Sequence, residues 1–423
     1  MKAIYWVSAL LLVSPATADD WPQWRGPNRD GVWKEKGLIS QFSTSEIPIK
    51  WRVEIGSGYS GPTVAKGRVY VTDRLRNPDR ERIHCFDEIT GAMIWSKSYS
   101  CSYAAVKYPA GPRAAVTIHD ELAYALGTTG LLHILKADTG EVIHTSDLKA
   151  RFDIQMPIWG IAAAPLIVDS QLILQIGGKE ACVVALDRKT GETRWTSLSD
   201  PASYSAPIYC ERNGKPEIIV WTGTNVHGLN PTDGQSRWTV NMGYNRWVIG
   251  MATPVLGKDR LLVTSTDRGS LMIHLVDEPQ TLWWKYGSGE DDTQSLHGFI
   301  GTPVMKNGHF YGVNKNGIFR CIDASNGKRI WEDRTATSQT RFSCMHIVRN
   351  GDCYWMFNDR GELIIATLSP QGYRELSRAK LIEPTHEQLR GRAGVTWSHP
   401  AFANRHIFAR SDKELVCASL AAE

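Results

Sequence analysis

Eight aromatic or arginine side chains recur beside eight short segments of small residues, and these side chains are the best candidates for ligand recognition. Each lies inside such a segment or within three residues of its start. Tyrosine, tryptophan and arginine are typical anchors of protein interfaces and of pockets for flat or anionic ligands. The eight are Tyr59, Arg113, Trp159, Tyr204, Trp247, Phe299, Arg341 and Trp397. They predict a binding surface, and the alternative is that the rings only pack on one another.

Sequence motifs for catalysis or metal binding are absent. The chain contains no GxSxG nucleophile elbow and no HExxH zinc motif. The stretch GEDD at 289–292 gathers carboxylates but lacks the alternating oxygen ligands of a calcium loop, so it predicts a solvated loop. His297 and His399 stand near two small-residue segments without a metal-binding spacing. We therefore predict no catalytic residue and no metal ligand.

The eight cysteines favour buried free thiols over disulfide bonds. Cys85, Cys182, Cys321 and Cys417 occupy similar late positions in different expected strands, as core residues would. Cys344 and Cys353 flank an Asn-Gly turn at 350–351, and a hairpin there would set Cys353 against Val348, out of reach of Cys344. Neither a CxxCH haem motif nor an adjacent Cys-Cys pair occurs.

One phrase repeats along the chain: an Asp or Asn, a Gly four residues later, and a Trp four residues after the Gly. An alternating apolar run precedes each phrase, for example CVVALD at 182–187, which predicts a strand. Asp or Asn opens a turn, Gly takes a positive φ, and a second strand ends in Trp. The four copies are Asp87/Gly91/Trp95, Asp187/Gly191/Trp195, Asn230/Gly234/Trp238 and Asp323/Gly327/Trp331. The unit is a β-hairpin with a periodic aromatic residue.

The small-residue segments number eight and begin 41 to 53 residues apart. That spacing and the Gly/aromatic motif are typical of a β-propeller built from four-stranded blades. Three phrases are degenerate: His144 replaces Trp, Trp283-Trp284 follow a turn without Gly, and Leu376 follows Gly372. We predict an all-β fold, an eight-bladed propeller of antiparallel four-stranded sheets.

The eighth unit ends before any turn or Trp, whereas Trp51 stands near the start with no turn before it. The segment KWRVEIG at 50–56 matches the post-turn strand RWTVNMG at 237–243. We therefore expect this N-terminal strand to complete the last blade and close the ring. The alternative is a seven-bladed ring with a stray segment.

Residues 1–18 have the pattern of a secretory signal. Lys2 is followed by a short apolar core and by Ala16-Thr17-Ala18, an A-x-A cleavage site. The apolar stretch is too short for a transmembrane segment, and no cysteine near it suggests a lipid anchor. We expect cleavage near Ala18, a periplasmic or secreted protein, a Trp-rich lead at 19–48 and a propeller at 49–420. The formal charge of +4 and the lack of basic runs argue against nucleic acid as a partner.

The phrase A-x-D-x-x-T-G-x-x-x-W, intact from Ala185 to Trp195, resembles the tryptophan-docking motif of propellers of the pyrroloquinoline quinone (PQQ) type. The opening DWPQWRGPNRDG at 20–31 resembles exported PQQ-like repeat proteins of planctomycete-type bacteria. The resemblance implies that each Trp is wedged between neighbouring blades. By position and strand register, this role falls to Trp51, Trp95, Trp195, Trp238 and Trp331, with Gly91, Gly191, Gly234 and Gly327 in the turns.

The resemblance leaves two branches open. Quinoprotein alcohol dehydrogenases bind PQQ and calcium, but their neighbouring-cysteine disulfide and their long inserts have no counterpart here. The barrel-assembly protein BamB is a propeller of similar length that binds proteins and no cofactor. We expect the second branch: a non-catalytic scaffold without cofactor that binds a protein or an envelope polymer at one channel mouth. A PQQ-dependent dehydrogenase acting on an alcohol or a sugar is the alternative. Trp21, Trp24 and Trp33 of the lead are expected to lie over the disc as a plug, and a ligand-binding role is the alternative.

Overall fold

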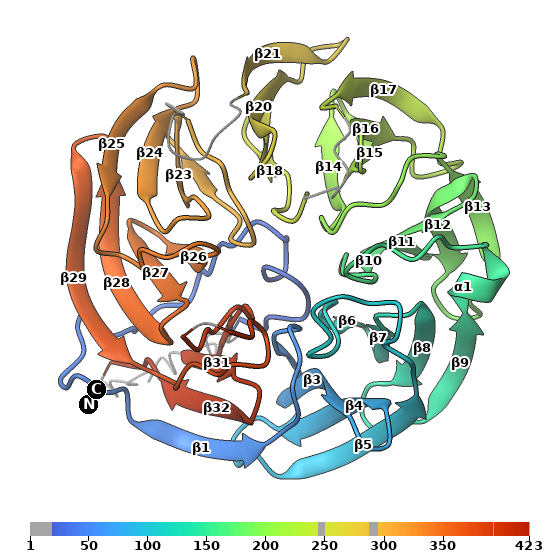
Figure 1. Ribbon diagram of the computed structural model, residues 1–423, viewed down its shortest axis with the longest axis horizontal. Coiled ribbons are helices and arrows are strands. Elements are labelled where there is room, and N and C mark those ends of the chain that lie inside the picture. The colour runs from blue at the N-terminus through green and yellow to red at the C-terminus, as the bar shows by residue number, and fades with distance from the viewer. Residues whose placement is uncertain (1–18, 244–249, 287–294, 392, 423) are drawn as a thin grey trace, which may run out of the picture.

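The chain folds into eight four-stranded antiparallel sheets arranged around a central axis (Figure 1). The computed structural model describes residues 19–243, 250–286, 295–391 and 393–422. Within these ranges the single α-helix, α1 (Leu148–Arg151), has four residues. The predicted all-β, eight-bladed propeller is confirmed.

The blades follow one another in chain order, and the strands of each blade are named here from the innermost to the outermost. The first four blades are β2 (Thr63–Ala65), β3 (Arg68–Leu75), β4 (Arg80–Asp87), β5 (Met93–Ser100); β6 (Thr117–His119), β7 (Leu122–Leu126), β8 (Leu131–Lys136), β9 (Val142–Asp147); β10 (Leu166–Val168), β11 (Gln171–Gly178), β12 (Ala181–Asp187), β13 (Thr193–Ser197); and β14 (Ile208–Arg212), β15 (Lys215–Trp221), β16 (Asn225–Leu229), β17 (Ser236–Asn241). The last four are β18 (Val255–Leu256), β19 (Arg260–Ser265), β20 (Gly269–His274), β21 (Gln280–Lys285); β22 (Val304–Lys306), β23 (His309–Val313), β24 (Phe319–Asp323), β25 (Arg329–Asp333); β26 (Met345–Asn350), β27 (Cys353–Asn358), β28 (Glu362–Ser369), β29 (Gly372–Lys380); and β30 (Ala401–Ala403), β31 (His406–Arg410), β32 (Glu414–Ser419), β1 (Ile49–Glu54).

The N-terminal strand closes the ring. β1 pairs antiparallel with β32, and Trp51 lies opposite Cys417. Figure 1 shows β1 as the outer edge of the blade that holds β31 and β32. The expected closure is therefore confirmed, and the seven-bladed alternative is wrong because β1 supplies the fourth strand of an eighth sheet.

Burial explains why inner and outer strands have different sequences. β12 is buried at six of its seven positions because neighbouring blades cover both its faces. In the outer strand β13 only Trp195 is buried. Continuous apolar runs therefore mark the inner strands, and a single large aromatic residue marks the outer ones.

At five of the eight junctions between blades, an indole of one blade bonds to the next blade. Each donates its Nε1–H to a backbone carbonyl at the turn between the third and fourth strands of the next blade. The bonds are Trp51 to Glu88 (2.8 Å), Trp95 to Ala137 (3.0 Å), Trp195 to Pro231 (2.9 Å), Trp283 to Ala324 (3.0 Å) and Trp331 to Ser369 (2.8 Å). Four of these rings belong to the set that the resemblance implies, and Trp283 performs the same contact although its own blade lacks the turn glycine.

Trp238, the fifth indole of that set, does not make this hydrogen bond. It is 8% exposed, and no described residue accepts a hydrogen bond from its Nε1. The turn of the next blade has no glycine, and Arg212 donates to the carbonyl of Val276 in that turn (2.9 Å). Between the second and third blades, His144 lies where an indole would, against Gly191.

In the seventh blade the docking position falls one residue later than the sequence suggests. A bulge in β29 sets Ser377, not Leu376, opposite Ile365, in the register that Trp95 has opposite Cys85. Ser377 is too small to reach the next blade. Its Oγ accepts a hydrogen bond from the backbone N–H of Phe42 in the lead (2.9 Å), so the lead fills the place of the missing indole.

All eight cysteines are free thiols, as expected. Two positional details were wrong. Cys353 pairs with Asn350 rather than Val348, because the two turn residues are Gly351 and Asp352 rather than Asn350 and Gly351. Cys85, Cys321 and Cys417 lie opposite docking tryptophans, but Ala185 takes that position in β12, three residues after Cys182.

The Trp-rich lead crosses the disc and packs on several blades. The backbone N–H of Trp21 donates to Val64 in β2, and that of Trp33 donates to Arg349 in β26. Both indoles are 1% exposed. Figure 1 shows this segment running through the middle of the ring before it reaches β1.

Candidate functional site

A cavity of about 810 Å³ opens at the mouth of the central channel, and we call it the cup. Its wall comes from the loops that lead into the innermost strands. Seven of the eight predicted recognition residues line it: Tyr59, Arg113, Trp159, Tyr204, Phe299, Arg341 and Trp397. The eighth, Trp247, lies outside the described residues, as does GEDD at 289–292. The structure thus brings the seven together, and their role in binding stays a prediction.

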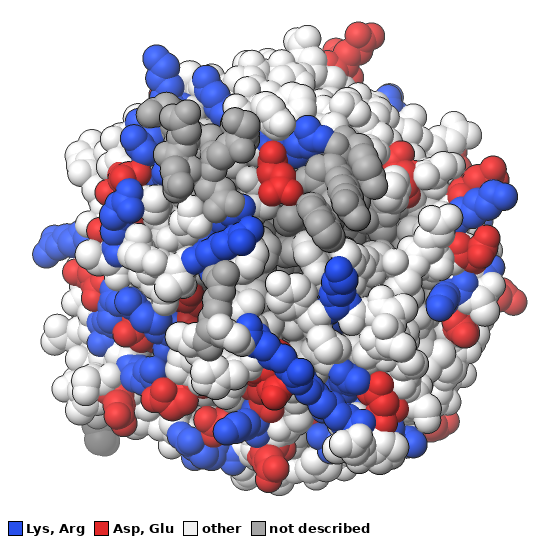
Figure 2. Space-filling model, viewed as in Figure 1, with Lys and Arg blue, Asp and Glu red and all other residues white. Residues whose placement is uncertain are grey.

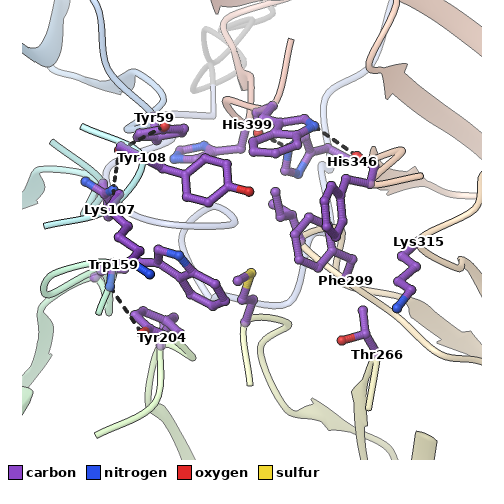
Figure 3. Close-up of a pocket in the computed structure, with 18 of the residues that line it drawn as sticks. Tyr59, Lys107, Tyr108, Trp159, Tyr204, Thr266, Phe299, Lys315, His346 and His399 are labelled. Atoms are coloured by element: carbon purple, nitrogen blue, oxygen red, sulfur yellow. Dashed lines mark hydrogen bonds between the residues drawn. The ribbon is translucent and has the colours of Figure 1, made fainter. Parts of the chain in front are cut away.

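Two groups of rings face each other across the cup (Figure 3). On one side Trp159 lies between Tyr108 and Tyr204, with ring centroids 6.3 and 5.1 Å away. On the other side Phe299 stacks on Phe342 at 5.1 Å and meets Trp397 edge-on at 5.9 Å. Such pairs hold their rings in fixed orientations. The rings do pack on one another, yet they leave an open space between the two groups.

Tyr59 joins the two groups. Its ring stacks on Trp397, and the Arg113 guanidinium lies 4.7 Å above it. Its hydroxyl donates to the carbonyl of Tyr108 (3.0 Å) or that of Gln388 (3.0 Å). Burial is the main cause that raises the pKa of Tyr59 above its usual value, and burial raises the pKa of Tyr204 to about 12. Both phenols are therefore protonated hydrogen-bond donors at neutral pH.

The charges of the cup are mostly positive. Lys107, Arg113, Lys315 and Arg341 line it, and Asp267 is the one carboxylate among its described lining residues. Burial is the main cause that lowers the pKa of Lys315, and Arg341 lowers it further against the effect of Asp267. The three bonds of Arg113 go to the carbonyls of Gly111, Lys107 and Tyr108.

The floor of the cup is built by the lead and two histidines. The Trp24 indole donates to Thr253 Oγ1 (2.7 Å) and meets the His399 ring edge-on at 4.5 Å. Burial lowers the pKa of His399 to about 3 and that of His346 to about 4. Both imidazoles are therefore neutral at pH 7. No metal-binding group forms around these histidines or anywhere else among the described residues.

Below the floor, Arg29 of the lead plugs the channel. Its guanidinium donates to the carbonyls of Pro165 and Pro207, at the starts of β10 and β14, and to Gln23 Oε1 (2.8 Å). Burial lowers the pKa of Arg29 to about 9, so the group stays charged at neutral pH. The cup therefore has a closed floor.

Sequence reasoning missed some cup residues, notably Lys315, Asp267, Lys107 and Tyr108. Lys315 follows β23 and Asp267 follows β19, in turns between the second and third strands of their blades. In an antiparallel sheet these turns return to the end where the first strand begins. The polar turns STDRG at 265–269 and VNKNG at 313–317 were therefore a usable signal. Lys107 and Tyr108 lie in the long connection between β5 and β6, which carries no repeat motif.

Comparison with known proteins agrees with this architecture. The sequence matches the family described as outer membrane protein assembly factor BamB over residues 32–211, 79–331 and 222–423. The chain belongs to the BamB family. The BamB of Yersinia pestis is 24% identical over 264 residues, which cover 61% of this chain and 64% of that protein. The chain thus aligns with somewhat less than two thirds of that relative's length.

Solved structures show the same fold. The crystal structure of BamB from Moraxella catarrhalis has a TM-score of 0.61 at 14% identity and covers 88% of this chain and 99% of that chain. A europium-containing methanol dehydrogenase has a TM-score of 0.68 at 13% identity and covers 93% of this chain and 90% of that chain. At such identities the likeness concerns the fold alone.

The described lining of the cup does not fit a calcium-bound quinone. Calcium takes six to eight oxygen ligands, largely carboxylates and carbonyls. Asp267 is the single carboxylate of the described lining, and the Lys and Arg side chains around it disfavour the binding of a calcium ion. No cysteine is among the described lining residues.

Proposed function

We propose that this chain is a non-catalytic binding propeller that holds a partner protein at the cup. The observation behind the proposal is the cup itself: two ring groups face an open space, with cations at their edges and a closed floor. Aromatic residues and arginine dominate the binding energy of protein interfaces. The matching family and the Yersinia pestis relative are both named as an outer membrane protein assembly factor, which favours a protein over an envelope polymer as the partner.

Export to the periplasm is part of the proposal. The signal-like pattern at 1–18 supports it, and so does the outer membrane in the name of the Yersinia pestis relative. Within the described residues no helix is long and apolar enough to cross a bilayer.

Site-directed cross-linking tests the cup as the binding site. A photoreactive phenylalanine replaces Tyr108, which is 40% exposed at the cup, or Tyr209, which is 42% exposed on β14. We expect one defined protein to cross-link from position 108 and not from position 209 in envelope extract. Equal capture from both positions, or none from 108, would contradict the proposal.

The captured protein, once purified, permits a direct affinity measurement. Trp159→Ala removes the central ring of one group and should weaken binding at least tenfold, since central aromatic anchors typically contribute 2 kcal/mol or more, roughly a thirtyfold change in Kd. Its melting temperature should stay close to that of the wild type because Trp159 is only partly buried. The matched control is Trp284→Ala, an indole 36% exposed on β21, which should leave Kd unchanged.

The dehydrogenase alternative has its own test. The protein is incubated with PQQ and calcium and assayed with a redox dye against alcohols and glucose. We expect no turnover because Asp267 is the one carboxylate in the described lining of the cup, which is too few to hold a calcium ion. Dye reduction that depends on both PQQ and the substrate would overturn the binding proposal in favour of the enzyme.

A further inference from the structure

The two ring groups of the cup differ in the hydrogen bonds that they can offer to a ligand. In the group of Phe299, Phe342 and Trp397, the Trp397 indole already donates its N–H to the carbonyl of Phe342 (3.1 Å). The two phenylalanine rings carry no hydrogen-bond donor. This group therefore presents mainly apolar ring surface to a ligand.

The group of Tyr108, Trp159 and Tyr204 keeps donors for a ligand. The hydrogen bonds that Tyr108 and Trp159 form with described residues use only their backbone atoms, so the phenol O–H and the indole N–H have no acceptor there. The Tyr204 hydroxyl accepts from the backbone N–H of Trp159 (3.4 Å), and no described residue accepts its own proton. Figure 3 shows the Tyr108 hydroxyl pointing into the cup. Three donors thus lie on one side of the cup.

Several carbonyl groups in the wall beside these donors already have hydrogen-bond partners. Arg113 donates to the carbonyls of Lys107 (3.0 Å) and Tyr108 (2.6 Å), and the Tyr59 hydroxyl lies 3.0 Å from the second of these carbonyls. The carbonyl of Ile158 accepts from the backbone N–H of Lys107 (2.9 Å). A ligand that brought many N–H or O–H groups would find these acceptors occupied. The wall therefore favours a ligand that mainly accepts hydrogen bonds.

The backbone of a proline-rich peptide is such a ligand. Most residues bring one N–H donor and one carbonyl acceptor, whereas proline brings the carbonyl alone. A proline-rich chain adopts the polyproline II helix, in which the carbonyls form no hydrogen bond within the helix. Their partial negative charge complements the N–H and O–H groups of Tyr108, Trp159 and Tyr204. Proline rings also pack on aromatic side chains, as they do in other grooves that recognise polyproline II segments.

The size and the surface of the cup agree with such an occupant. Its volume of about 810 Å³ lies within the range of pockets that enclose a small ligand or a few side chains. Figure 2 shows uncharged side chains beside a few Lys and Arg side chains around the middle of this face. A sugar polymer also stacks on aromatic rings, but its many hydroxyl donors would meet the occupied carbonyls. A proline-rich peptide therefore fits the described wall better than a sugar polymer does.

We infer that the cup binds a proline-rich segment of the partner protein in the polyproline II conformation. The proline rings lie between the two ring groups, and carbonyls of the segment accept hydrogen bonds from Tyr108, Trp159 and Tyr204. The inference rests on the proposed function, since it specifies what the partner presents to the cup.

A displayed library of random ten-residue peptides tests the inference on the full chain. Selection on the wild-type protein should enrich peptides with three or more prolines at least fivefold over the input library. The best peptide is then synthesised with its prolines intact and with each proline replaced by alanine, which restores the backbone N–H and loosens the helix. The alanine version should bind at least tenfold more weakly.

Variants of the protein test the donors. Tyr108→Phe and Trp159→Phe each keep an aromatic ring and remove one donor, so each should weaken binding of the selected peptide threefold or more. Tyr108 is 40% exposed, so its variant should fold even if that of Trp159 does not. The controls Tyr209→Phe on β14 and Trp284→Phe on β21 make the same changes at residues that are 42% and 36% exposed, and they should leave the Kd unchanged.

Three outcomes overturn the inference: a selected pool without proline enrichment, an alanine version that binds as tightly as the selected peptide, or a Kd that neither donor variant changes. Cellohexaose that displaces the selected peptide and binds more tightly would replace the proline-rich segment by a sugar polymer. If the partner still cross-links from position 108 in any of the first three cases, the proposed function stands and only the chemistry of the segment is wrong.

Discussion

At the scale of single residues, the two histidines in the floor of the cup link the site to pH. His399 Nε2 accepts a hydrogen bond from the backbone N–H of Gly61 (3.1 Å), which requires the neutral ring. His346 Nε2 lies 2.9 Å from the carbonyl of Trp397. Burial is the main cause that lowers both pKa values, and the charge of Arg25 lowers them further.

These shifts predict a loss of stability in mild acid. The unfolded chain takes up protons on both histidines below their usual pKa of about 6.5, whereas the folded chain does not until about pH 4 for His346 and pH 3 for His399. Their contribution is therefore complete above about pH 6.5 and decreases as the pH falls towards 4. Each histidine should cost about 1.4 kcal/mol per pH unit in this window. Urea unfolding at pH 7, 6 and 5 measures the slope.

A substitution separates this effect from general acid sensitivity. His399→Asn should lower the free energy of unfolding at pH 7 but reduce its dependence on pH between 6.5 and 5. The control His119→Asn changes a ring whose side chain is 44% exposed, and it should keep the wild-type slope. A slope that His399→Asn does not change would show that the floor histidines are not the titrating groups.

The sequence predicted the cup residues that lie at the starts of the innermost strands, because the small-residue segments mark those starts. Tyr204 and Trp397 could be placed in this way. Trp24 could not, because its position depends on how the lead crosses the channel. Nor could Lys107, since the connection between β5 and β6 has no repeat against which to align it.

At the scale of secondary-structure elements, the blades are held together by an indole of one blade lying on the turn glycine of the next. A Cβ atom on Gly91 would lie 2.7 Å from the Trp51 ring, and Gly91 has a φ of +72°. Gly67 has a similar φ of +74°, yet a Cβ there would have no atom within 4 Å. Both glycines therefore need a positive φ, but only Gly91 lies against a tryptophan ring.

This pair makes the contribution of the contact measurable. Gly67→Ala should lower the free energy of unfolding by about 1–2 kcal/mol, the cost of a left-handed conformation for alanine. Gly91→Ala should cost about 2–3 kcal/mol more, because the methyl group displaces the Trp51 ring that joins the last blade to the first. Urea unfolding of both variants gives the difference. Equal losses would mean that the ring moves aside freely and does not hold the junction.

The contacts that replace a missing indole or turn glycine could not be predicted from the sequence. Trp283 docks although its own blade has no turn glycine, because the glycine it needs belongs to the next blade, at Gly327. The junction beside Ser377 has no indole, and the lead residue Phe42 packs there instead. A sequence repeat reveals the junctions where an indole meets a turn glycine. The junctions without such a pair depend on contacts between segments that are distant in the sequence.

At the scale of the whole molecule, the lead and the ring depend on each other. β1 joins the last blade to the first, and the preceding residues cross the disc and plug its channel. Arg29 is the centre of the plug, and its charge is buried at a cost that its hydrogen bonds must offset. Without Arg29 the Pro165 carbonyl keeps the hydrogen bond from Thr117 Oγ1 (2.7 Å), whereas the buried Pro207 carbonyl loses the one from Arg29, so removing the guanidinium should cost more stability than it relieves.

Arg29→Met tests this balance, since methionine keeps much of the apolar stem and donates no hydrogen bond. We expect the free energy of unfolding to fall by about 2–4 kcal/mol. Hydrogen exchange of peptides covering 20–33 should accelerate more than tenfold, as the bonds from Trp21 to Val64 and from Trp33 to Arg349 open.

Lys36→Met introduces the same residue at an exposed position of the lead and should change neither quantity. Exchange of β24 on the far blade should stay the same in both variants, because the loosening begins at the channel. If Arg29→Met left the exchange of 20–33 unchanged, the lead would be held by its contacts with the blades alone. The closed floor of the cup would then not depend on the buried charge.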